Sequence, residues 1–179
     1  MISPATVFLD RDGTVNAKAP EGDYVTSWEQ FEFLPGAVEA VRLLSARGVR
    51  LVVVTNQRGI ALGRMTEQDL ADIHRRMCDA LTAAGGAIAE VYHCPHEANT
   101  CDCRKPEIGM FLQAQRDFPD IRFEHSAVIG DSSSDMLAAR RIGAKAVFLG
   151  DPGALGEADD VRDEVSILGA ARWLLGGDD

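Results

Sequence analysis

The stretch "ATVFLDRDGT", residues 5–14, decides the fold class of this chain. It begins with an apolar run that lacks the polar alternation of a half-exposed strand, and an acidic, glycine-containing turn follows at once. A continuous apolar run is typical of a strand that is buried on both faces of a sheet. We therefore expect a buried strand over residues 5–10 and a polar turn at its carboxyl end.

Similar apolar runs recur along the chain, separated by helical patterns. Further strands are expected at 49–55, 87–93, 126–130 and 144–150, and helices at 36–48, 65–86, 107–118, 134–143 and 165–176. Thr66 is the expected N-cap of the second helix. This alternation predicts an α/β fold, a Rossmann-like parallel sheet with helices on both faces. We expect a single domain over residues 1–179, with a flap or hairpin at about 14–34 and a mobile acidic loop at 150–160.

The charge balance limits the classes of partner. The 179 residues include 18 Lys and Arg against 28 Asp and Glu, a formal net charge of −10. A phosphate backbone requires a basic surface, so we expect no nucleic acid partner. The N-terminus resembles no signal peptide and no apolar run could span a membrane, so a cytoplasmic protein without membrane contact is expected. In that compartment thiols stay reduced, and clustered cysteines more often bind metal.

Polar residues follow the expected strands, at the sheet edge where ligands bind in open α/β folds. Asp10 and Asp12 follow the first strand, and Asp131 and Asp135 follow the fourth. Each pair taken alone could be an acidic turn or a helix cap. Two carboxylate pairs at one edge repel each other, however, and a divalent cation such as Mg²⁺ would relieve that repulsion. The sequence therefore favours a catalytic Mg²⁺ site at this edge.

Two further segments could hold a phosphate group near that site. The hydroxyl of Thr55 and the backbone amides around Asn56 lie at the tip of the second strand and could bind phosphate oxygens, although this segment taken alone fits an ordinary polar loop better. Lys105 would add a cation that offsets charge during group transfer. Asn16, just after the acidic turn, is another candidate contact for substrate.

The stretch "HCPHEANTCDC", residues 93–103, concentrates metal-binding side chains directly before Arg104 and Lys105. Thiolate and imidazole ligands in a closed set of four are typical of structural Zn²⁺. The expected zinc loop spans residues 93–105 and would hold the two cations still; free thiols in a flexible loop are the alternative. The four expected ligands are Cys94, His96, Cys101 and Cys103.

Four motifs in this order resemble those of the haloacid dehalogenase (HAD) superfamily of phosphatases: "FLDRDGT", "VVVTN", "RKP" and "GDSSSDM". More narrowly, "FLPG", "VVVTNQRGIALG", "CPH" and "CDCRKP" resemble its histidinol-phosphate and heptose-bisphosphate phosphatase group. The resemblance implies a HAD-like fold without a large cap domain, and zinc at the cysteine-rich loop.

The same resemblance implies a role for each motif residue. Asp10 would attack phosphorus and form an aspartyl-phosphate, and Asp12 would act as general acid and then base near neutral pH. Mg²⁺ would be bound by the Asp10 carboxylate, the Asp12 backbone carbonyl and Asp131. The transferring phosphate would be held by Thr55, the Asn56 backbone and Lys105, with Asp135 supporting Lys105.

The expected substrate is a small phosphorylated sugar, D-glycero-D-manno-heptose 1,7-bisphosphate losing its 7-phosphate. Arg58, Arg64 and Arg104 could meet a second phosphate, whereas histidinol phosphate carries a cationic amine and should prefer acidic neighbours. Ser132 departs from the heptose enzymes, which usually have Lys there, and Arg58 stands where Ser is common. Histidinol-phosphate phosphatase, a phosphotransferase and a catalytically silent zinc-stabilised binding module remain alternatives. A monomer is expected.

Overall fold

The computed structural model describes residues 3–150 and 161–177 of the chain. Strands and helices alternate in it, as the apolar runs predict. The strands are β1 (Thr6–Leu9), β2 (Arg50–Asn56), β3 (Glu90–Cys94), β4 (Ser126–Gly130), β5 (Lys145–Leu149) and β6 (Val161–Glu164). The helices are α1 (Ala37–Ala46), α2 (Glu67–Ala83), α3 (Gly109–Asp117), α4 (Ser133–Ile142) and α5 (Ile167–Leu174), with short 3₁₀ turns at Trp28–Gln30 and Phe123–His125.

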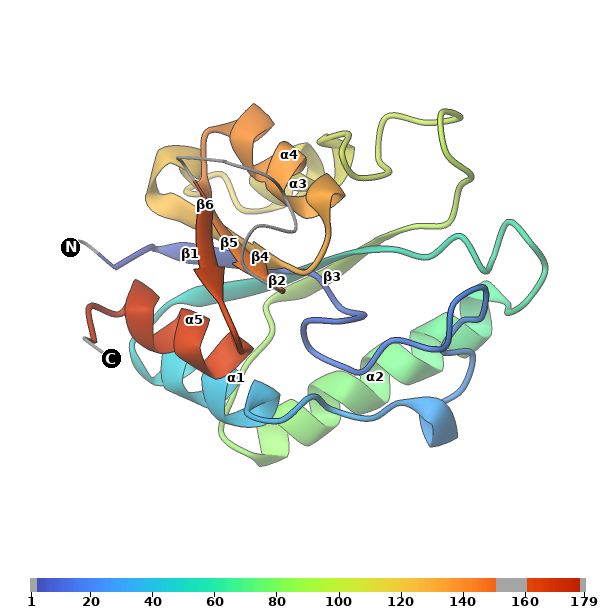
Figure 1. Ribbon diagram of the computed structural model, residues 1–179, viewed down its shortest axis with the longest axis horizontal. Helices are drawn as coiled ribbons and strands as arrows, with labels where there is room; N and C mark the ends of the chain where they lie inside the picture. The colour runs from blue at the N-terminus through green and yellow to red at the C-terminus, as the bar shows by residue number, and fades with distance from the viewer. Residues whose placement is uncertain (1–2, 151–160, 178–179) are drawn as a thin grey trace.

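The six strands form one parallel sheet in the order β3-β2-β1-β4-β5-β6 (Figure 1). β1 therefore lies between β2, which ends in Thr55 and Asn56, and β4, which Asp131 follows directly. Leu9, the last residue of β1, is paired with Val53 of β2 and with Ile129 of β4. This register brings the polar residues that follow β1, β2 and β4 to the same edge of the sheet.

Helices cover both faces of the sheet, so the fold has three layers. Val7 and Leu9 pack on the face covered by α1, α2 and α5, while Phe8 packs on the face covered by α3 and α4 (Figure 1). Because successive side chains of a strand point to opposite faces, a strand with both faces covered needs apolar residues throughout. The predicted α/β fold with a helix-covered parallel sheet is confirmed.

Several boundaries differ from those expected. β6 was not predicted because its sequence, Val-Arg-Asp-Glu, is polar; it forms an edge of the sheet, where Asp163 is exposed. Residues 14–34 contain no regular hairpin, but an antiparallel bridge joins Asn16 to Phe33 and closes the segment. The expected N-cap Thr66 accepts a hydrogen bond from the Asp69 amide. Residues 151–160 of the expected acidic loop lie outside the described residues.

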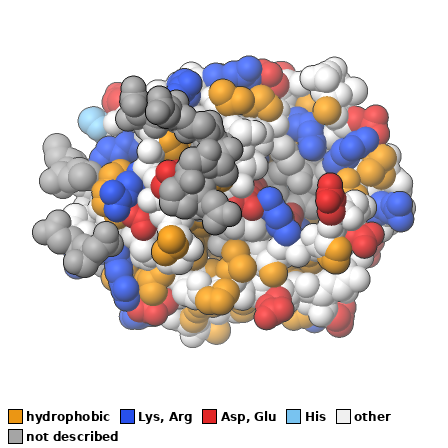
Figure 2. All heavy atoms as spheres, in the orientation of Figure 1, with side chains coloured by type: hydrophobic (Ala, Val, Ile, Leu, Met, Phe, Trp, Pro, Cys, Tyr) orange, Lys and Arg blue, Asp and Glu red, His pale blue; other side chains and the backbone are white. Residues whose placement is uncertain are grey.

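The surface is mixed in charge on the face shown in Figure 2, where basic and acidic side chains are interspersed among the described residues. Within the described ranges, no helix combines the length and the apolar character needed to cross a bilayer.

Candidate active site

Lys105 lies between two buried carboxylates at the carboxyl edge of the sheet. Its Nζ is 2.7 Å from Asp10 Oδ1 and 2.6 Å from Asp135 Oδ1, and it donates to the Val54 carbonyl at 2.7 Å. Burial raises the pKa of Asp10 to about 7; the charge of Asp135 acts in the same direction and that of Lys105 opposes it. Burial disfavours the charged form of Lys105, but the two carboxylates hold its pKa above the usual value. One cation thus faces two acids in a buried site.

Asp12 is held by three side chains that donate hydrogen bonds to its carboxylate. Arg11 Nη2 lies 2.9 and 3.0 Å from the two oxygens, Asn16 Nδ2 donates at 2.9 Å and Gln57 Nε2 at 2.8 Å. Burial favours the neutral acid, but the Arg11 charge and these hydrogen bonds outweigh it and lower the pKa of Asp12. This direction differs from the expected carboxyl that titrates near neutral pH. Asn16 is fully buried, and its Nδ2 is paired with Asp12 while its Oδ1 has no hydrogen-bond partner among the described residues. Its expected contact with substrate stays a prediction.

The end of β2 is tied to the loop that carries Lys105. Asn56 Oδ1 accepts from the Lys105 amide at 3.0 Å, and Asn56 Nδ2 donates to the Lys105 carbonyl at 3.1 Å. The Asn56 side chain is therefore paired with the backbone of Lys105, and the expected contact of the Asn56 backbone with phosphate stays a prediction. Thr55 Oγ1 accepts from Gln57 Nε2 at 2.9 Å, so its own hydroxyl proton is free to be donated elsewhere.

Asp131 completes a group of carboxylates with oxygens close enough to share one ion. Ligand atoms of Asp10, Asp131 and Asp135 all lie within 4.8 Å of one another. Asp131 Oδ1 is buried without a hydrogen-bond partner, while Oδ2 forms an ion pair with Lys18. Buried polar atoms are seldom left unpaired, and hard oxygen ligands suit Mg²⁺. The donor set therefore fits a magnesium ion.

Two glycines allow these carboxylates to approach the backbone. Gly13 has φ +90°, and a Cβ there would collide with the Asp131 carboxylate. A Cβ at Gly130 would collide with the carboxylate of Asp135. Asp135 Oδ2 also accepts from the Ser132 amide at 3.1 Å and from its hydroxyl at 2.6 Å, which fixes the first turn of α4.

The cysteine-rich loop brings its four expected ligands together. Cys103 Sγ lies 3.0 Å from Cys94 Sγ and 3.4 Å from Cys101 Sγ, and His96 Nδ1 lies 3.3 Å from Cys103 Sγ. All four ligand atoms lie within 4.8 Å of one another, and none of the cysteines forms a disulfide. Three thiols and one imidazole in this arrangement fit a closed tetrahedral zinc site.

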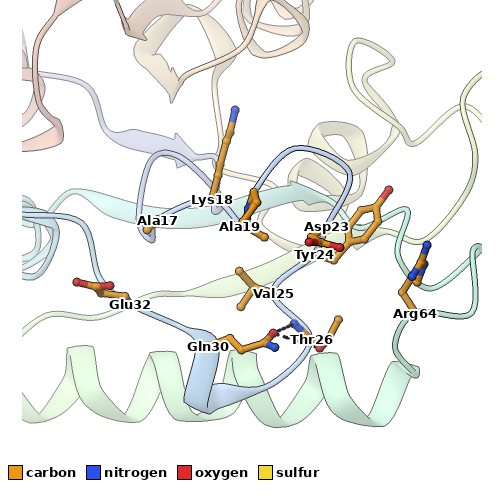
Figure 3. Close-up of a pocket in the computed structure, with 11 residues that line it drawn as sticks. Ala17, Lys18, Ala19, Asp23, Tyr24, Val25, Thr26, Gln30, Glu32 and Arg64 are labelled. Carbon is orange, nitrogen blue, oxygen red and sulfur yellow. Dashed lines mark hydrogen bonds between the residues drawn. The ribbon is translucent and has the colours of Figure 1, made fainter.

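The arginines expected near substrate take different positions. Arg58 Nη2 lies 3.4 Å from Glu97 of the zinc loop, and Arg104 Nη1 donates to the His96 carbonyl at 3.4 Å. Both are partly exposed, Arg58 beside this loop and Arg104 within it. Arg64 instead lines a hollow whose other lining residues belong to the segment 17–32 (Figure 3).

Two hollows meet at Lys18. The smaller, of about 140 Å³, is lined by residues of the strand edge that include Asp10, Thr55 and Asp131. The larger, of about 560 Å³, lies under the flap, where Figure 3 shows Lys18 and Arg64 on opposite sides. Lys18 lines both, so the two hollows adjoin.

Four side chains of this region were missed in the sequence as functional candidates: Arg11, Lys18, Gln57 and His74. Arg11 and Gln57 lie inside the recognised motifs, so their place in the sequence was a usable signal. Lys18 belongs to an irregular segment and His74 to the buried side of α2, and neither position shows a sequence pattern that predicts its contact.

Comparisons with known proteins agree with this geometry. A family model described as HAD-hydrolase-like matches residues 102–162. The chain is 42% identical over 165 residues to the D-glycero-alpha-D-manno-heptose-1,7-bisphosphate 7-phosphatase of Mycobacterium bovis, an alignment covering 89% of this chain and 86% of that protein. The chain belongs to the HAD-like phosphatase family.

Other members of this phosphatase family extend the comparison. The D-glycero-beta-D-manno-heptose-1,7-bisphosphate 7-phosphatase of Vibrio cholerae is 40% identical over 151 residues, covering 80% of this chain and 78% of that one. The crystal structure of D,D-heptose 1,7-bisphosphate phosphatase from B. bronchiseptica, complexed with magnesium and phosphate, matches with a TM-score of 0.87 at 30% identity, covering 96% and 98%. The resemblance drawn from the four motifs is confirmed.

Proposed function

We propose that this phosphatase removes the 7-phosphate of a D-glycero-D-manno-heptose 1,7-bisphosphate through an aspartyl-phosphate at Asp10. The observation that carries the chemistry is the Lys105 ammonium, 2.7 Å from the Asp10 carboxylate at the wall of a phosphate-sized cavity. The names of the relatives support the choice of substrate. Both anomeric forms occur among those names, so the proposal covers either anomer.

Asp10 performs the covalent step. A carboxylate oxygen of Asp10 forms a bond to phosphorus while the bond between phosphorus and the sugar oxygen breaks, and Asp12 gives its proton to that leaving oxygen. Water then attacks the phosphorus, Asp12 accepts a proton from it, and the bond to Asp10 breaks. Inorganic phosphate leaves and both carboxyl groups return to their starting state.

Asp12 must carry a proton at the start of this sequence, although its pKa is low in the ligand-free site. A phosphate dianion held beside it would raise that pKa, because a neighbouring negative charge disfavours ionisation. Arg11, Asn16 and Gln57 fix the direction of the carboxyl group throughout.

The transferring phosphate needs donors and positive charge around it. Thr55 and the Asn56 backbone would donate to its oxygens, and Lys105 would offset their charge. Magnesium would be held by the Asp10 and Asp131 carboxylates and the Asp12 carbonyl, and when bound it supplies charge that keeps Asp10 ionised and neutralises the phosphate. Asp135 holds Lys105 in place.

We assign a structural zinc ion to Cys94, His96, Cys101 and Cys103. A closed set of four ligands has no open position for chemistry. The loop leads directly into Arg104 and Lys105, so fixing it reduces the entropy cost of holding these cations in place. The supporting observation is that all four ligand atoms already lie within 4.8 Å of one another.

The rest of the substrate would extend under the flap. The inner cavity of about 140 Å³ accommodates a phosphate group, and the adjoining hollow of about 560 Å³ could receive a sugar. Lys18 and Arg64 line this hollow and could bind the second phosphate. Asp23 and Glu32 line it too, and these acids would suit the amine of histidinol phosphate, which is the second candidate.

Phosphate release from four substrates in the presence of Mg²⁺ tests the proposal. These are both anomers of heptose 1,7-bisphosphate, fructose 1,6-bisphosphate and histidinol phosphate. We expect the highest kcat/KM for one heptose anomer, with the 1-phosphate retained in the product. A higher value for histidinol phosphate would replace the proposed substrate, and release from none of the four would refute it.

A further inference from the structure

Arg11 is a fully buried cation whose guanidinium has two partners of different kinds. On one side it donates to the Asp12 carboxylate, with Nη2 2.9 and 3.0 Å from the two oxygens. On the other side its Nη1 lies 3.2 Å from Nε2 of His74, a residue 63 positions away on α2. A buried guanidinium is destabilising unless its donors are paired, and the contact with His74 supplies a partner for Nη1, which the Asp12 carboxylate does not reach.

Arg11 fixes the protonation state of its partner His74. A guanidinium has donors only, so His74 Nε2 must present its lone pair and the ring proton must be on Nδ1. Burial lowers the pKa of His74 to about 3, and the positive charge of Arg11 acts in the same direction. His74 is therefore a neutral acceptor.

His74 anchors Arg11 to an element outside the active-site loop. Arg11 and Asp12 are neighbours in the chain, so their mutual ion pair alone does not fix either group relative to the sheet edge. The contact with His74 ties the guanidinium to the buried side of α2, which packs against the sheet. A guanidinium held at one end presents its other donors in a fixed plane.

We propose that His74 is a positioning residue for phosphoryl transfer, which holds Arg11 so that Arg11 aims the Asp12 carboxyl group at the leaving oxygen. The inference rests on the proposed function, because it presumes that Asp12 delivers a proton during ester cleavage. Binding of the phosphate group itself depends on other residues, chiefly Thr55 and Lys105. Loss of His74 should therefore lower kcat more than it changes KM.

The leaving group provides a readout that a purely structural role would not affect. A sugar alkoxide must be protonated as it leaves, whereas p-nitrophenolate is a weak base and leaves with little help. Misdirecting Asp12 should therefore slow the first step, transfer of the phosphoryl group to Asp10, far more with a sugar phosphate than with p-nitrophenyl phosphate; the later attack of water is common to both esters. A displacement of about 1 Å in a catalytic group lowers rates by up to roughly 100-fold.

The experiment compares His74→Leu with His74→Gln in the full chain with Mg²⁺ and Zn²⁺ supplied. Leu removes the acceptor, while the side-chain carbonyl of Gln can accept from Arg11. We expect His74→Leu to lower the single-turnover rate of sugar release from the heptose ester by about 10- to 100-fold, with KM and the single-turnover release of p-nitrophenol within about threefold of wild type. His74→Gln should recover most of the loss. His93→Gln, a change in the adjacent histidine that contacts Glu67, is the control and should be neutral.

Equal losses on both esters, or no recovery with Gln, would overturn the role of His74. If His74→Leu does not fold, His74→Asn, whose shorter amide does not reach Arg11, takes its place in the comparison. If the wild-type protein does not cleave heptose bisphosphate but cleaves another sugar phosphate, the proposed substrate is refuted. The same variants then test the role of His74 with that ester. A wild type that cleaves no phosphomonoester overturns both proposals.

Discussion

The ammonium of Lys105 lies 2.7 Å from the Asp10 carboxylate, with only 2% and 12% of the two side chains exposed. Asp135, fully buried, lies on the other side of the same ammonium. This relationship joins the proposed nucleophile, which directly follows β1, to the residue that comes two positions after Cys103, the last of the proposed zinc ligands. A cation enclosed by two acids supports both the stability and the chemistry of the site.

Replacing Lys105 with Met should abolish phosphate release and destabilise the fold. The change leaves Asp10 and Asp135 buried beside each other without a cation, and breaking a buried pair costs about 3–5 kcal/mol. Urea unfolding measures the loss of stability. Arg116→Met, which removes an exposed cation from α3, is the control. A Lys105→Met protein within about 1 kcal/mol of wild type would show that the pair contributes little.

Replacing Gly13 with Ala should weaken Mg²⁺-dependent turnover more than the left-handed backbone conformation of Gly13 alone explains. Gly13 and Gly22 have φ of +90° and +88°, but only a Cβ at Gly13 meets the Asp131 carboxylate; Gly22 has open space. Both variants should lose about 1–2 kcal/mol from left-handed strain. Only Gly13→Ala should also weaken Mg²⁺-dependent turnover, measured as the Mg²⁺ concentration at half-maximal rate. Equal behaviour of the two variants would exclude the collision as the cause.

Replacing Cys103 with Ser should remove zinc and lower thermal stability, because Cys103 Sγ lies within 3.4 Å of three other ligand atoms. Metal analysis of the purified protein should give about one zinc per wild-type chain and much less in the variant. Cys78→Ser provides the matched control, since Cys78 lies on α2 outside the cluster. Zinc lost equally from both variants, or from neither, would argue against the assigned site.

The stability of the folded protein should fall with acid partly through His74. Burial and the Arg11 charge lower its pKa from 6.5 to about 3; His93 also lowers it and Asp12 opposes them. Below pH 6.5 His74 binds a proton in the unfolded chain but not in the folded protein. The contribution of neutral His74 to the free energy of unfolding is therefore fully present above pH 6.5 and is lost as the pH falls toward 3. Urea unfolding of wild type and His74→Gln across this range should show the steeper loss in wild type. Parallel curves would mean that His74 titrates normally in the folded state.

The sheet and most site residues could be predicted because their signals are local. Unbroken apolar runs such as 126–130 indicate strands covered on both faces, and polar residues at strand ends indicate the ligand-binding edge. β6 could not be predicted, because an edge strand needs no continuous apolar run. The contact between His74 and Arg11 depends on how α2 packs against the sheet, which no local pattern encodes. Burial opposes the lowered pKa of Asp12, which the Arg11 charge chiefly causes; the smaller contribution of Gln57 is a long-range contact, since the fold brings this residue from the end of β2.

The most direct test of the account is the rate of phosphate release by wild type and Asp10→Asn on the preferred heptose bisphosphate with Mg²⁺. Asn keeps the shape of the side chain but is not a nucleophile, so the account predicts a loss of at least about 1,000-fold. Asp163→Asn, an exposed change on β6, should retain the wild-type rate, and both variants should unfold as single cooperative transitions. An Asp10→Asn protein that stays folded and keeps its rate within about tenfold of wild type would contradict phosphoryl transfer to Asp10.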